Sequence, residues 1–429
     1  MNSTEFELFE PFRPGQDGPW DRATAAHLLR RTQLGVSPDS LEAALAGTPA
    51  QAVARVLETS GPADSTAVRR TLTTGELRFV QADWAARLCT PSAHSLNERL
   101  ALMWHGHFAT SDAKVDDVRL MFGQLETLRA LGAGDFRELL SAIAIDPAML
   151  IWLDGVENRA KAPNENLARE LFELFGLGIG HYTEDDVQEA ARALSGWTVR
   201  GRRAHFDPRR HDNGEKQVFG KSVANVEDVV AEIIAHPACS RWIARRLLST
   251  FVGIEAYPAL EDALAERLIA ADWRIDSVLE QLLGSRLMLS SQWRYPRVAS
   301  PVEYLAGVGF GLGVRLKPTE AVEHLARMGQ DLLRPPTVEG WKGGRTWISP
   351  SSWIARERCA AALAASWESL APERDLGGDL DAWLSALMPG QSPPSWTDEL
   401  RAEVQSTTMG NARGEWMTLL LASPEIHLS

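Results

Sequence analysis

The stretch from Leu96 to Val223 opens with the segment Leu102-Met103-Trp104-His105-Gly106-His107-Phe108. A second polar segment follows it, Asn164-Glu165-Asn166-Leu167-Ala168-Arg169-Glu170-Leu171-Phe172-Glu173, and a third closes the stretch, His211-Asp212-Asn213-Gly214-Glu215-Lys216. We call these the first, second and third polar segments. Their imidazole, carboxylate and ammonium groups are too concentrated for surface decoration, so we expect the chemistry of the protein to lie here.

Apolar residues recur at helical spacing on both sides of these segments. The helices predicted up to the third segment are 23–31, those opened by Ser37-Pro38 and Thr48-Pro49, 68–88, 95–105, 112–131, 136–145, 164–175 and 183–195. Those predicted after it are 226–235, 240–251, 259–270, 275–283, 301–311 and 319–328. Serine or threonine followed by proline is a typical helix start, because the hydroxyl caps the helix and proline fits its first position.

Only one region carries a β pattern. Trp197-Thr198-Val199 and Ala204-His205-Phe206 flank a turn at Gly201, which predicts a hairpin, and Asn213-Gly214 marks a second tight turn before Gln217-Val218-Phe219. The sequence therefore predicts a mainly α protein, a multi-helix globular bundle with a small β-hairpin insertion near residues 197–221.

Three parts of the chain are expected. Residues 1–20 form an extended N-terminal arm, residues 21–370 a main helical domain, and residues 371–429 a C-terminal helical appendage with a break at 389–396. The loop 329–350 is long, and three tryptophans lie in or beside it, so we expect it to be ordered and functional. The chain has fifteen tryptophans, which predicts a tryptophan-rich core.

Composition excludes several classes. The net charge of −13 repels phosphate backbones, so no nucleic-acid partner is expected. Three scattered cysteines fit neither a disulfide framework nor a zinc-thiolate site. No apolar run predicts a membrane span and no leader is evident, so the expected location is cytoplasmic, or exported if a leader was removed. The phosphate-binding and dinucleotide-binding motifs are missing, so no nucleotide cofactor is expected.

The first segment contains a His-x-His pair. In an extended backbone two such side chains share a face, which is a common spacing of metal ligands. In a helix they point about 200° apart, so they converge on one ion only if the helix ends at Gly106. The alternative is a pair of hydrogen-bonded histidines in an aromatic core.

The second segment places Glu165, Arg169 and Glu173 four residues apart along one helix face. Arg169 could orient the two carboxylates and leave Glu170 free as a metal ligand or base. The alternative is a solvated face of ion pairs. Further along, Thr183 and Asp186 have the spacing of a capping box, which is a structural rather than a chemical role.

The third segment combines an adjacent His211-Asp212 pair with Lys216. One interpretation is a loop that lies over a pocket, in which Lys216 clamps an anionic group. The other is a turn stabilised by the Asp212 side chain.

Several of these segments, in this order, resemble the bacterial domain of unknown function 1800 family. The resemblance covers about residues 22–365. It rests on the run 104–111, the second polar segment, Tyr182 to Val187, Ser195-Gly196-Trp197, His211-Asp212 with Lys216, Ala26 to Arg31, and Gly340-Trp341 to Pro350. It implies that the three segments act as one unit, and many members of the family look exported. It implies no substrate.

The function that we expect is a metal-dependent enzyme acting on a small or anionic substrate. The expected ligands are His105, His107, Glu170, His211 and Asp212, around a divalent Zn, Mn or Fe ion, and the expected catalytic residues are Glu165, Arg169, Glu173 and Lys216. Hydrolysis by a metal-bound water comes first, because the stretch lacks the Glu-x-x-His pair of di-iron proteins. The alternatives are a metal-dependent oxidoreductase and a non-catalytic binding or scaffold protein with an internal ion-pair network. In the scaffold alternative, the tryptophan-rich loop at 337–353 docks a protein partner or a sugar.

Overall fold

The computed structural model describes residues 3–58, 72–92, 95–294, 297–370, 380–389, 397–399, 402 and 413–428. These residues are mainly helical and include two small antiparallel two-stranded sheets. The predicted fold class is therefore confirmed. The predicted helix start at 68–71 and most of the predicted break at 389–396 lie outside the described residues.

The N-terminal part of the chain holds ten of the labelled helices in the described residues. They are α1 (Ser3–Glu7), α2 (Arg22–Gln33), α3 (Pro38–Leu45), α4 (Pro49–Leu57), α6 (Leu77–Leu88), α7 (Ser95–His107), α8 (Asp112–Val115), α9 (Val118–Leu131), α10 (Phe136–Ala144) and α11 (Pro147–Trp152). A short 3-10 turn, Gly155–Glu157, follows α11.

The middle of the chain holds α12 (Asn166–Glu170), which continues into the π-helix η2 (Leu171–Gly176), and α13 (Glu184–Ala193). Four strands follow: β1 (Trp197–Arg200), β2 (Arg203–Phe206), β3 (Gln217–Val218) and β4 (Lys221–Ser222). Then come α14 (Val226–Ala235), α15 (Pro237–Leu247), the π-helix η3 (Leu248–Val252), α16 (Pro258–Ala270), α17 (Ile275–Leu283) and α18 (Arg286–Leu289). The last elements include α19 (Pro301–Leu312), α20 (Pro318–Arg327), the 3-10 turn η5 (Gly344–Trp347), α21 (Pro350–Leu370), α22 (Leu380–Leu387) and α24 (Arg413–Leu421).

Local capping explains where several helices begin. Ser37, Thr48, Thr183 and Ser300 each accept a hydrogen bond from the backbone of the third helical residue, whose side chain bonds back to the cap. Such a capping box satisfies two backbone N–H groups that the first turn leaves without partners. The capping box predicted at Thr183 is confirmed.

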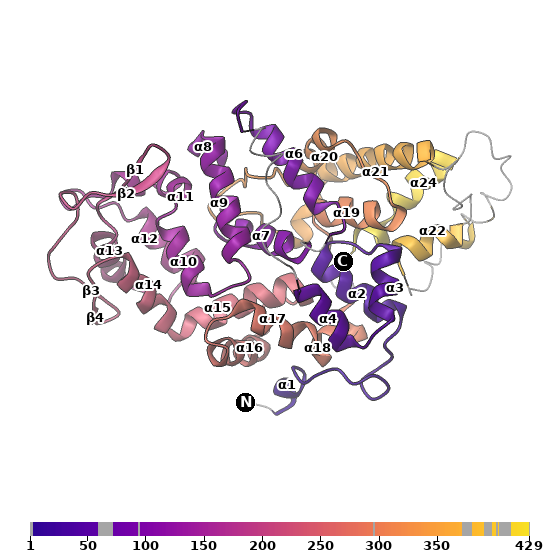
Figure 1. Ribbon diagram of the computed structural model, residues 1–429, viewed down its shortest axis with the longest axis horizontal. Helices are drawn as coiled ribbons and strands as arrows, with labels where there is room; N and C mark the ends of the chain where they lie inside the picture. The colour runs from indigo at the N-terminus through magenta and orange to yellow at the C-terminus, as the bar shows by residue number, and fades with distance from the viewer. Residues whose placement is uncertain are drawn as a thin grey trace.

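Helix α7 lies at the centre of the molecule (Figure 1) and packs against α2, α6 and α9. Every residue of α7 except Asn97 is buried. A helix that is buried all round belongs to the core, so the polar side chains on it need partners inside the protein. Around this core, four tryptophans are less than 2% exposed, and the predicted tryptophan-rich core is confirmed: Trp84, Trp104, Trp367 and Trp383.

The prediction that this helix ends at His105 is wrong, since α7 runs to His107. Gly106 does not stop the helix, because the surrounding core holds it in place. The predicted single helix 112–131 is also two helices. They are separated at Asp116, which has a left-handed backbone (φ 49°), and Asp117 caps α9 by accepting from the N–H groups of Arg119 and Leu120.

The hairpin predicted at 197–206 is confirmed, with Trp197 opposite Phe206 and Arg200 opposite Arg203. A second hairpin, between β3 and β4, follows the predicted turn at Asn213-Gly214 and has a turn of its own. The turn lies at Phe219-Gly220, where both residues have positive φ. The small sheets lie on the left of Figure 1, away from the C-terminal helices.

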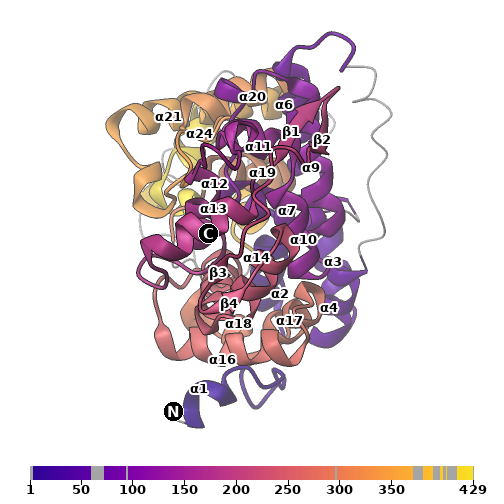
Figure 2. The same ribbon diagram turned by 90° about the vertical axis from the view of Figure 1, so that its left-hand side faces the viewer.

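Both ends of the described chain pack on the helical body. The N-terminal arm is not wholly extended: α1 lies beneath α16 (Figure 2), and Phe9 and Phe12 are buried. At the other end α24 packs along α21, and the Tyr304 hydroxyl donates to the Leu421 carbonyl over 3.1 Å. The boundary predicted at residue 370 stays a prediction. In the described residues, no helix has both the length and the hydropathy that a membrane span requires.

Candidate functional site

His105 and His107 leave α7 in different directions, as helical residues two apart must. The His105 ring lies edge-on to Trp84 and Trp341, with centroid distances of 5.5 and 5.4 Å. The His107 ring lies against Trp104, and its Nε2 is 2.9 Å from the carbonyl oxygen of Phe175 in η2. The structure therefore gives the two imidazoles separate surroundings.

Both imidazoles are neutral at physiological pH. Burial lowers the pKa of His105 to about 3, and burial together with the nearby Arg246 cation lowers the pKa of His107 to about 3. Because a neutral ring carries one proton and Phe175 offers only an acceptor, Nε2 of His107 is the donor and Nδ1 keeps its lone pair. His107 also lines a cavity, so it is the histidine of the pair that a ligand can reach.

Gly106 has a steric role between the two histidines. A Cβ atom there would lie 2.9 Å from Nη2 of Arg246, which donates to the Met103 carbonyl over 3.0 Å. Gly340, with φ 76°, approaches from the other side, where a Cβ atom would lie 2.3 Å from the Gly106 oxygen. The two glycines let the Arg246 guanidinium and the loop that carries Trp341 close directly onto the helix backbone.

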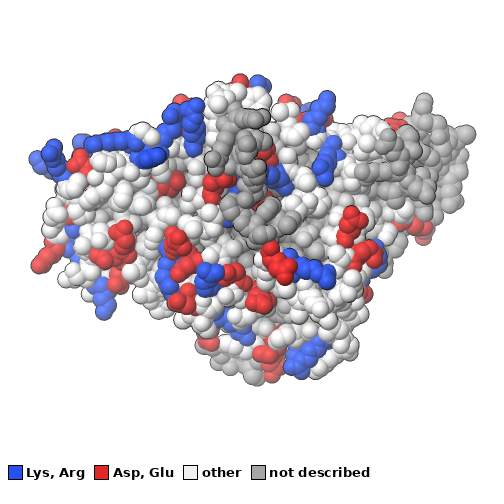
Figure 3. All heavy atoms as spheres, viewed as in Figure 1, with Lys and Arg blue, Asp and Glu red and all other residues white. Residues whose placement is uncertain are grey.

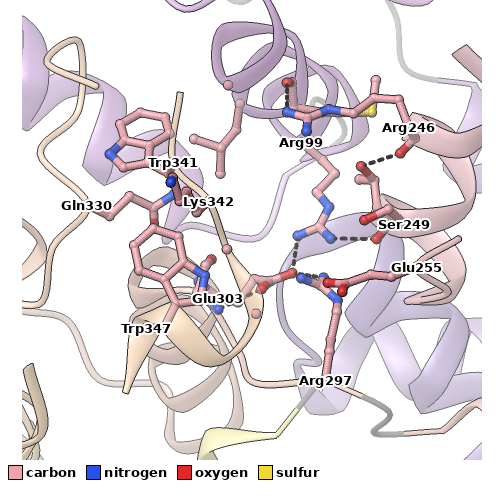
Figure 4. A pocket seen from close by; sticks show the side chains of 17 residues that line it. Arg99, Arg246, Ser249, Glu255, Arg297, Glu303, Gln330, Trp341, Lys342 and Trp347 are labelled. Carbon is pink, nitrogen blue, oxygen red and sulfur yellow. Dashed lines mark hydrogen bonds and ion pairs between the residues drawn. The ribbon is translucent and has the colours of Figure 1, made fainter. Parts of the chain in front are cut away.

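A cavity of about 140 Å³, which we call the inner cavity, lies at this junction (Figure 4). Arg99 of α7, Arg246 of α15 and Ser249 of η3 lie on one side of it. Trp341 and Trp347 of the tryptophan-rich loop lie on the other. These residues come from segments that are far apart in the sequence.

Glu303 organises the floor of the inner cavity. It is the third residue of the α19 capping box, and its carboxylate accepts from the Ser300 N–H over 2.8 Å. The same carboxylate accepts from Nη1 of Arg99 over 2.6 Å and from Arg297. Burial by itself would raise the pKa of Glu303, but the Arg297 and Arg99 cations outweigh it and hold the pKa far below its usual range. One carboxylate thus serves two guanidinium groups.

Arg246 and Lys342 add two further positive charges to the lining. Among the described residues no carboxylate pairs with Arg246, and burial lowers its pKa to about 10, which leaves it charged at neutral pH. Lys342 is exposed and lies 3.8 Å from Glu339, a distance that solvent screens strongly.

A second cavity, the middle cavity, adjoins the inner one and measures about 350 Å³. His107 and Trp242 line it, together with residues that also line the inner cavity, among them Arg246, Ser249, Glu255 and Lys342. His107 and the Arg246 cation therefore line one connected space.

The second polar segment forms ion pairs near the surface. Arg169 donates to Glu165 over 3.1 Å and to Glu184 over 2.7 Å, whereas Glu173 accepts from the Tyr182 hydroxyl over 2.6 Å. Glu170 is half-buried, and burial, with the neighbouring carboxylates of Glu173 and Glu339, raises its pKa to about 6. Figure 3 shows acidic and basic groups interspersed over this side of the molecule, where α13 and α14 lie.

The third polar segment is held by hydrogen bonds within the segment and by contacts with Ser195 and Arg192. Nδ1 of His211 donates to the Ser195 carbonyl over 2.8 Å. Asp212 pairs with Arg192 over 2.8 Å and accepts from the Gly214 N–H over 2.8 Å, which is the turn that the structural interpretation predicted. The ammonium group of Lys216 donates to the carbonyls of Asp212 and Gly214 over 2.6 and 2.8 Å.

The three segments are thus brought together only in part. His107 contacts η2, which continues from the helix of the second segment, and lines the middle cavity. Glu170 and His211 do not line that cavity. Across the described ranges, no group of three or more His, Cys, Asp or Glu side chains is arranged to hold a metal ion. The predicted ligands and catalytic residues stay predictions, and no chemical step is assigned through a metal here.

Sequence reasoning missed four charged residues of the inner cavity, namely Arg99, Arg246, Arg297 and Glu303. Two local signals were available. Ser300-Pro301-Val302-Glu303 has the pattern of a capping box, and Arg245-Arg246 lies among apolar residues at helical spacing. Neither signal shows that these residues meet, because they lie on different elements. The structure describes the whole tryptophan-rich loop, and Trp341 and Trp347 line the cavity.

Comparison with known proteins gives one match. Residues 27–428 match the family described as protein of unknown function (DUF1800). No curated protein and no solved structure matches the chain. The match covers the inner cavity, all three polar segments and the tryptophan-rich loop. The chain belongs to the DUF1800 family.

Proposed function

We propose that the protein binds a small anionic molecule, of the phosphate monoester class, in the inner and middle cavities. One observation carries the proposal. Arg99, Arg246, Arg297 and Lys342 line the inner cavity against two carboxylates, those of Glu255 and Glu303, although the whole chain has a net charge of −13. The lining therefore has two positive charges in excess, which matches a dianion.

The distribution of that positive excess supports a position for the anion beside Arg246. Arg99 and Arg297 share Glu303, so their charges are partly compensated. Arg246 and Lys342 lie where the two cavities meet. A partly desolvated guanidinium binds phosphate oxygens through short, charge-assisted hydrogen bonds, and each is stronger than a bond between neutral groups. We place the phosphoryl group next to Arg246, with the tryptophan-rich loop closing over it.

Isothermal titration with inorganic phosphate and phenyl phosphate tests this proposal. Arg246→Gln should weaken binding of both by roughly tenfold to a hundredfold, since a hydrogen bond to a charged group contributes about 1.5–3 kcal/mol. Lys342→Gln changes an exposed side chain, so it tests the site without risk to the fold. Arg327→Gln is the matched control, because it removes an exposed cation that lines neither cavity. Binding of neither probe by the wild type, or equal binding by wild type, Arg246→Gln and Lys342→Gln, would overturn the proposal.

Metal-dependent hydrolysis of the bound ligand is the second candidate. His107 favours it, because its imidazole lines the middle cavity and is neutral, which is the form that ligates a metal. His105 is a poorer candidate for a metal ligand, because its ring packs against Trp84 and Trp341.

Metal content measured by mass spectrometry, after dialysis against zinc, manganese and ferrous salts, separates the two candidates. If a metal is bound, His107→Asn should abolish its binding and His105→Asn should not. A wild-type protein without stoichiometric metal would end the metal candidate and leave the anion-binding proposal standing.

A further inference from the structure

The cationic site continues along one side of α15. Arg241, Trp242, Arg245 and Arg246 lie at positions one and four residues apart, and Ser249 follows in η3. Residues four apart stack on one side of a helix, so these side chains form a stripe. Successive parts of the stripe line three cavities, which makes the helix a common wall.

The third cavity, the outer cavity, measures about 500 Å³ and is lined by Leu177, Ile179, His181, Trp242 and Pro258, among others. It shares Trp242 and Arg245 with the middle cavity, just as the middle cavity shares Arg246 and Ser249 with the inner one. The three cavities therefore follow one another along α15 and η3. A ligand bound at Arg246 has space to extend toward Ile179.

The charges along this row are not uniform. At the outer end Arg241 pairs with Asp262 over 2.5 Å, and Arg245 pairs with Glu261 over 2.9 Å, so both cations are compensated. At the inner end Arg246 has no carboxylate partner among the residues described. The row offers uncompensated positive charge at one end only, which does not match a polyanion.

The outer cavity has an apolar wall. Ile179 is 77% exposed there, next to Leu177 and Trp242. Trp242 is held in place because its Nε1 donates to the Leu174 carbonyl over 2.8 Å and its ring packs on Gly178, where a Cβ atom would lie 3.0 Å away. The exposed isoleucine and the fixed indole together offer an apolar surface that a hydrocarbon chain can cover, which would remove that surface from water.

We infer that the ligand is an amphiphilic anion, with a phosphate group at Arg246 and an apolar tail that runs along α15 into the outer cavity. This inference rests on the proposed function and adds the second half of the ligand. Each methylene group that enters the apolar part should tighten binding by roughly fourfold, the ratio that the transfer free energy of a buried CH₂ implies.

The experiment compares inorganic phosphate with methyl, butyl, hexyl and octyl phosphate by isothermal titration, each below its micelle concentration. The wild type should bind the longer esters progressively more tightly. Ile179→Glu should abolish that gain and leave binding of inorganic phosphate unchanged. Ile269→Glu is the matched control, because Ile269 is also exposed, at 57%, but lines none of the three cavities.

The outcomes separate the two proposals. Phosphate binding without a gain from chain length would overturn the amphiphile and leave the proposed function intact. A gain that Ile179→Glu and Ile269→Glu affect equally would overturn the placement of the tail. Failure of the wild type to bind any of the phosphates would overturn the proposed function and this inference with it.

Discussion

The charged face formed by α12, α13 and the third polar segment differs from the inner cavity in its ratio of cations to carboxylates and in how far apart the paired residues lie in the sequence. On the face, Arg169 and Arg192 each pair with two carboxylates, and their partners come from nearby in the sequence. In the cavity, two guanidiniums share the one carboxylate of Glu303, and one of them, that of Arg99, lies 204 positions away in the sequence. Carboxylates therefore outnumber guanidiniums in the pairs of the face, which lie near solvent, whereas guanidiniums outnumber carboxylates in the cavity, where the pairs are largely buried.

This difference teaches that a dense run of charged residues is weak evidence for a site. Residues close in sequence on a helix find each other, and solvent screens the pairs that they form. Solvent tolerates unbalanced charge at the surface, but an unbalanced charge that the fold buries needs an ion or a ligand to compensate it. The chemistry is therefore expected where unbalanced charge is buried rather than where charge is dense.

The largest effect on stability should come from Glu303→Gln. This change leaves Arg99 and Arg297 without their shared carboxylate inside the protein, which typically costs about 3–5 kcal/mol. Urea unfolding of the variant and the wild type measures the loss. A free energy of unfolding within about 1 kcal/mol of the wild type would show that the ion pairs of the cavity stabilise the fold no more than those of the charged face.

The second effect appears in acid. The unfolded chain protonates His105 below its ordinary pKa of about 6.5, whereas the folded protein does so only near pH 3. The stabilising contribution is therefore complete above about pH 6.5 and is lost as the pH falls toward 3, which amounts to about 2 kcal/mol at pH 5. His105→Phe keeps an aromatic ring between Trp84 and Trp341, so it should lose less stability between pH 7 and pH 5 than the wild type. Equal losses would contradict the assigned burial.

Thr183→Ala tests a smaller contribution on the charged face. Removing the capping hydroxyl should cost about 1 kcal/mol. Phosphate binding per folded molecule should not change, because Thr183 caps α13 and lines none of the three cavities. Thermal unfolding and titration of the same sample give both values. A loss of binding without a loss of stability would place Thr183 in the site.

Asp212→Asn should have the smallest effect. The amide still accepts from the Gly214 N–H, so the turn is kept, and only the partly exposed ion pair with Arg192 is lost. Such a pair contributes about 0.2–1 kcal/mol, and less at high salt. Urea unfolding at low and high salt checks this expectation. If Asp212→Asn also removed bound metal, the third polar segment would regain the role of ligand that the sequence predicted for it.

Much of the fold was predictable because its signals are local. Proline and hydroxyl caps mark the starts of α3, α4 and α19, and alternating residues mark the β1–β2 hairpin. The errors occurred where the tertiary structure overrides a local signal. Gly106 predicts a helix end, but it lies inside α7, where Arg246 packs against the space that a side chain would fill.

The site was predictable only in part. The sequence drew attention to His107 and to the loop of Trp341, and both line the connected cavities. It also drew attention to Arg169 and Lys216. Arg169 donates to Glu184, and Lys216 donates to the Asp212 carbonyl of its own segment. Local density of polar residues cannot distinguish these cases, since both look alike before the chain folds.

By itself the sequence determined the helical class, the caps, the first hairpin and the membership of the family, because these depend on neighbours along the chain. Only the tertiary structure decided which charges are buried together. The inner cavity is formed by several segments and is contained in none of them. Its charged lining includes Arg99, Arg246, Arg297 and Glu303. The energy of a charge depends on its surroundings in space, and those are set by residues more than a hundred positions away.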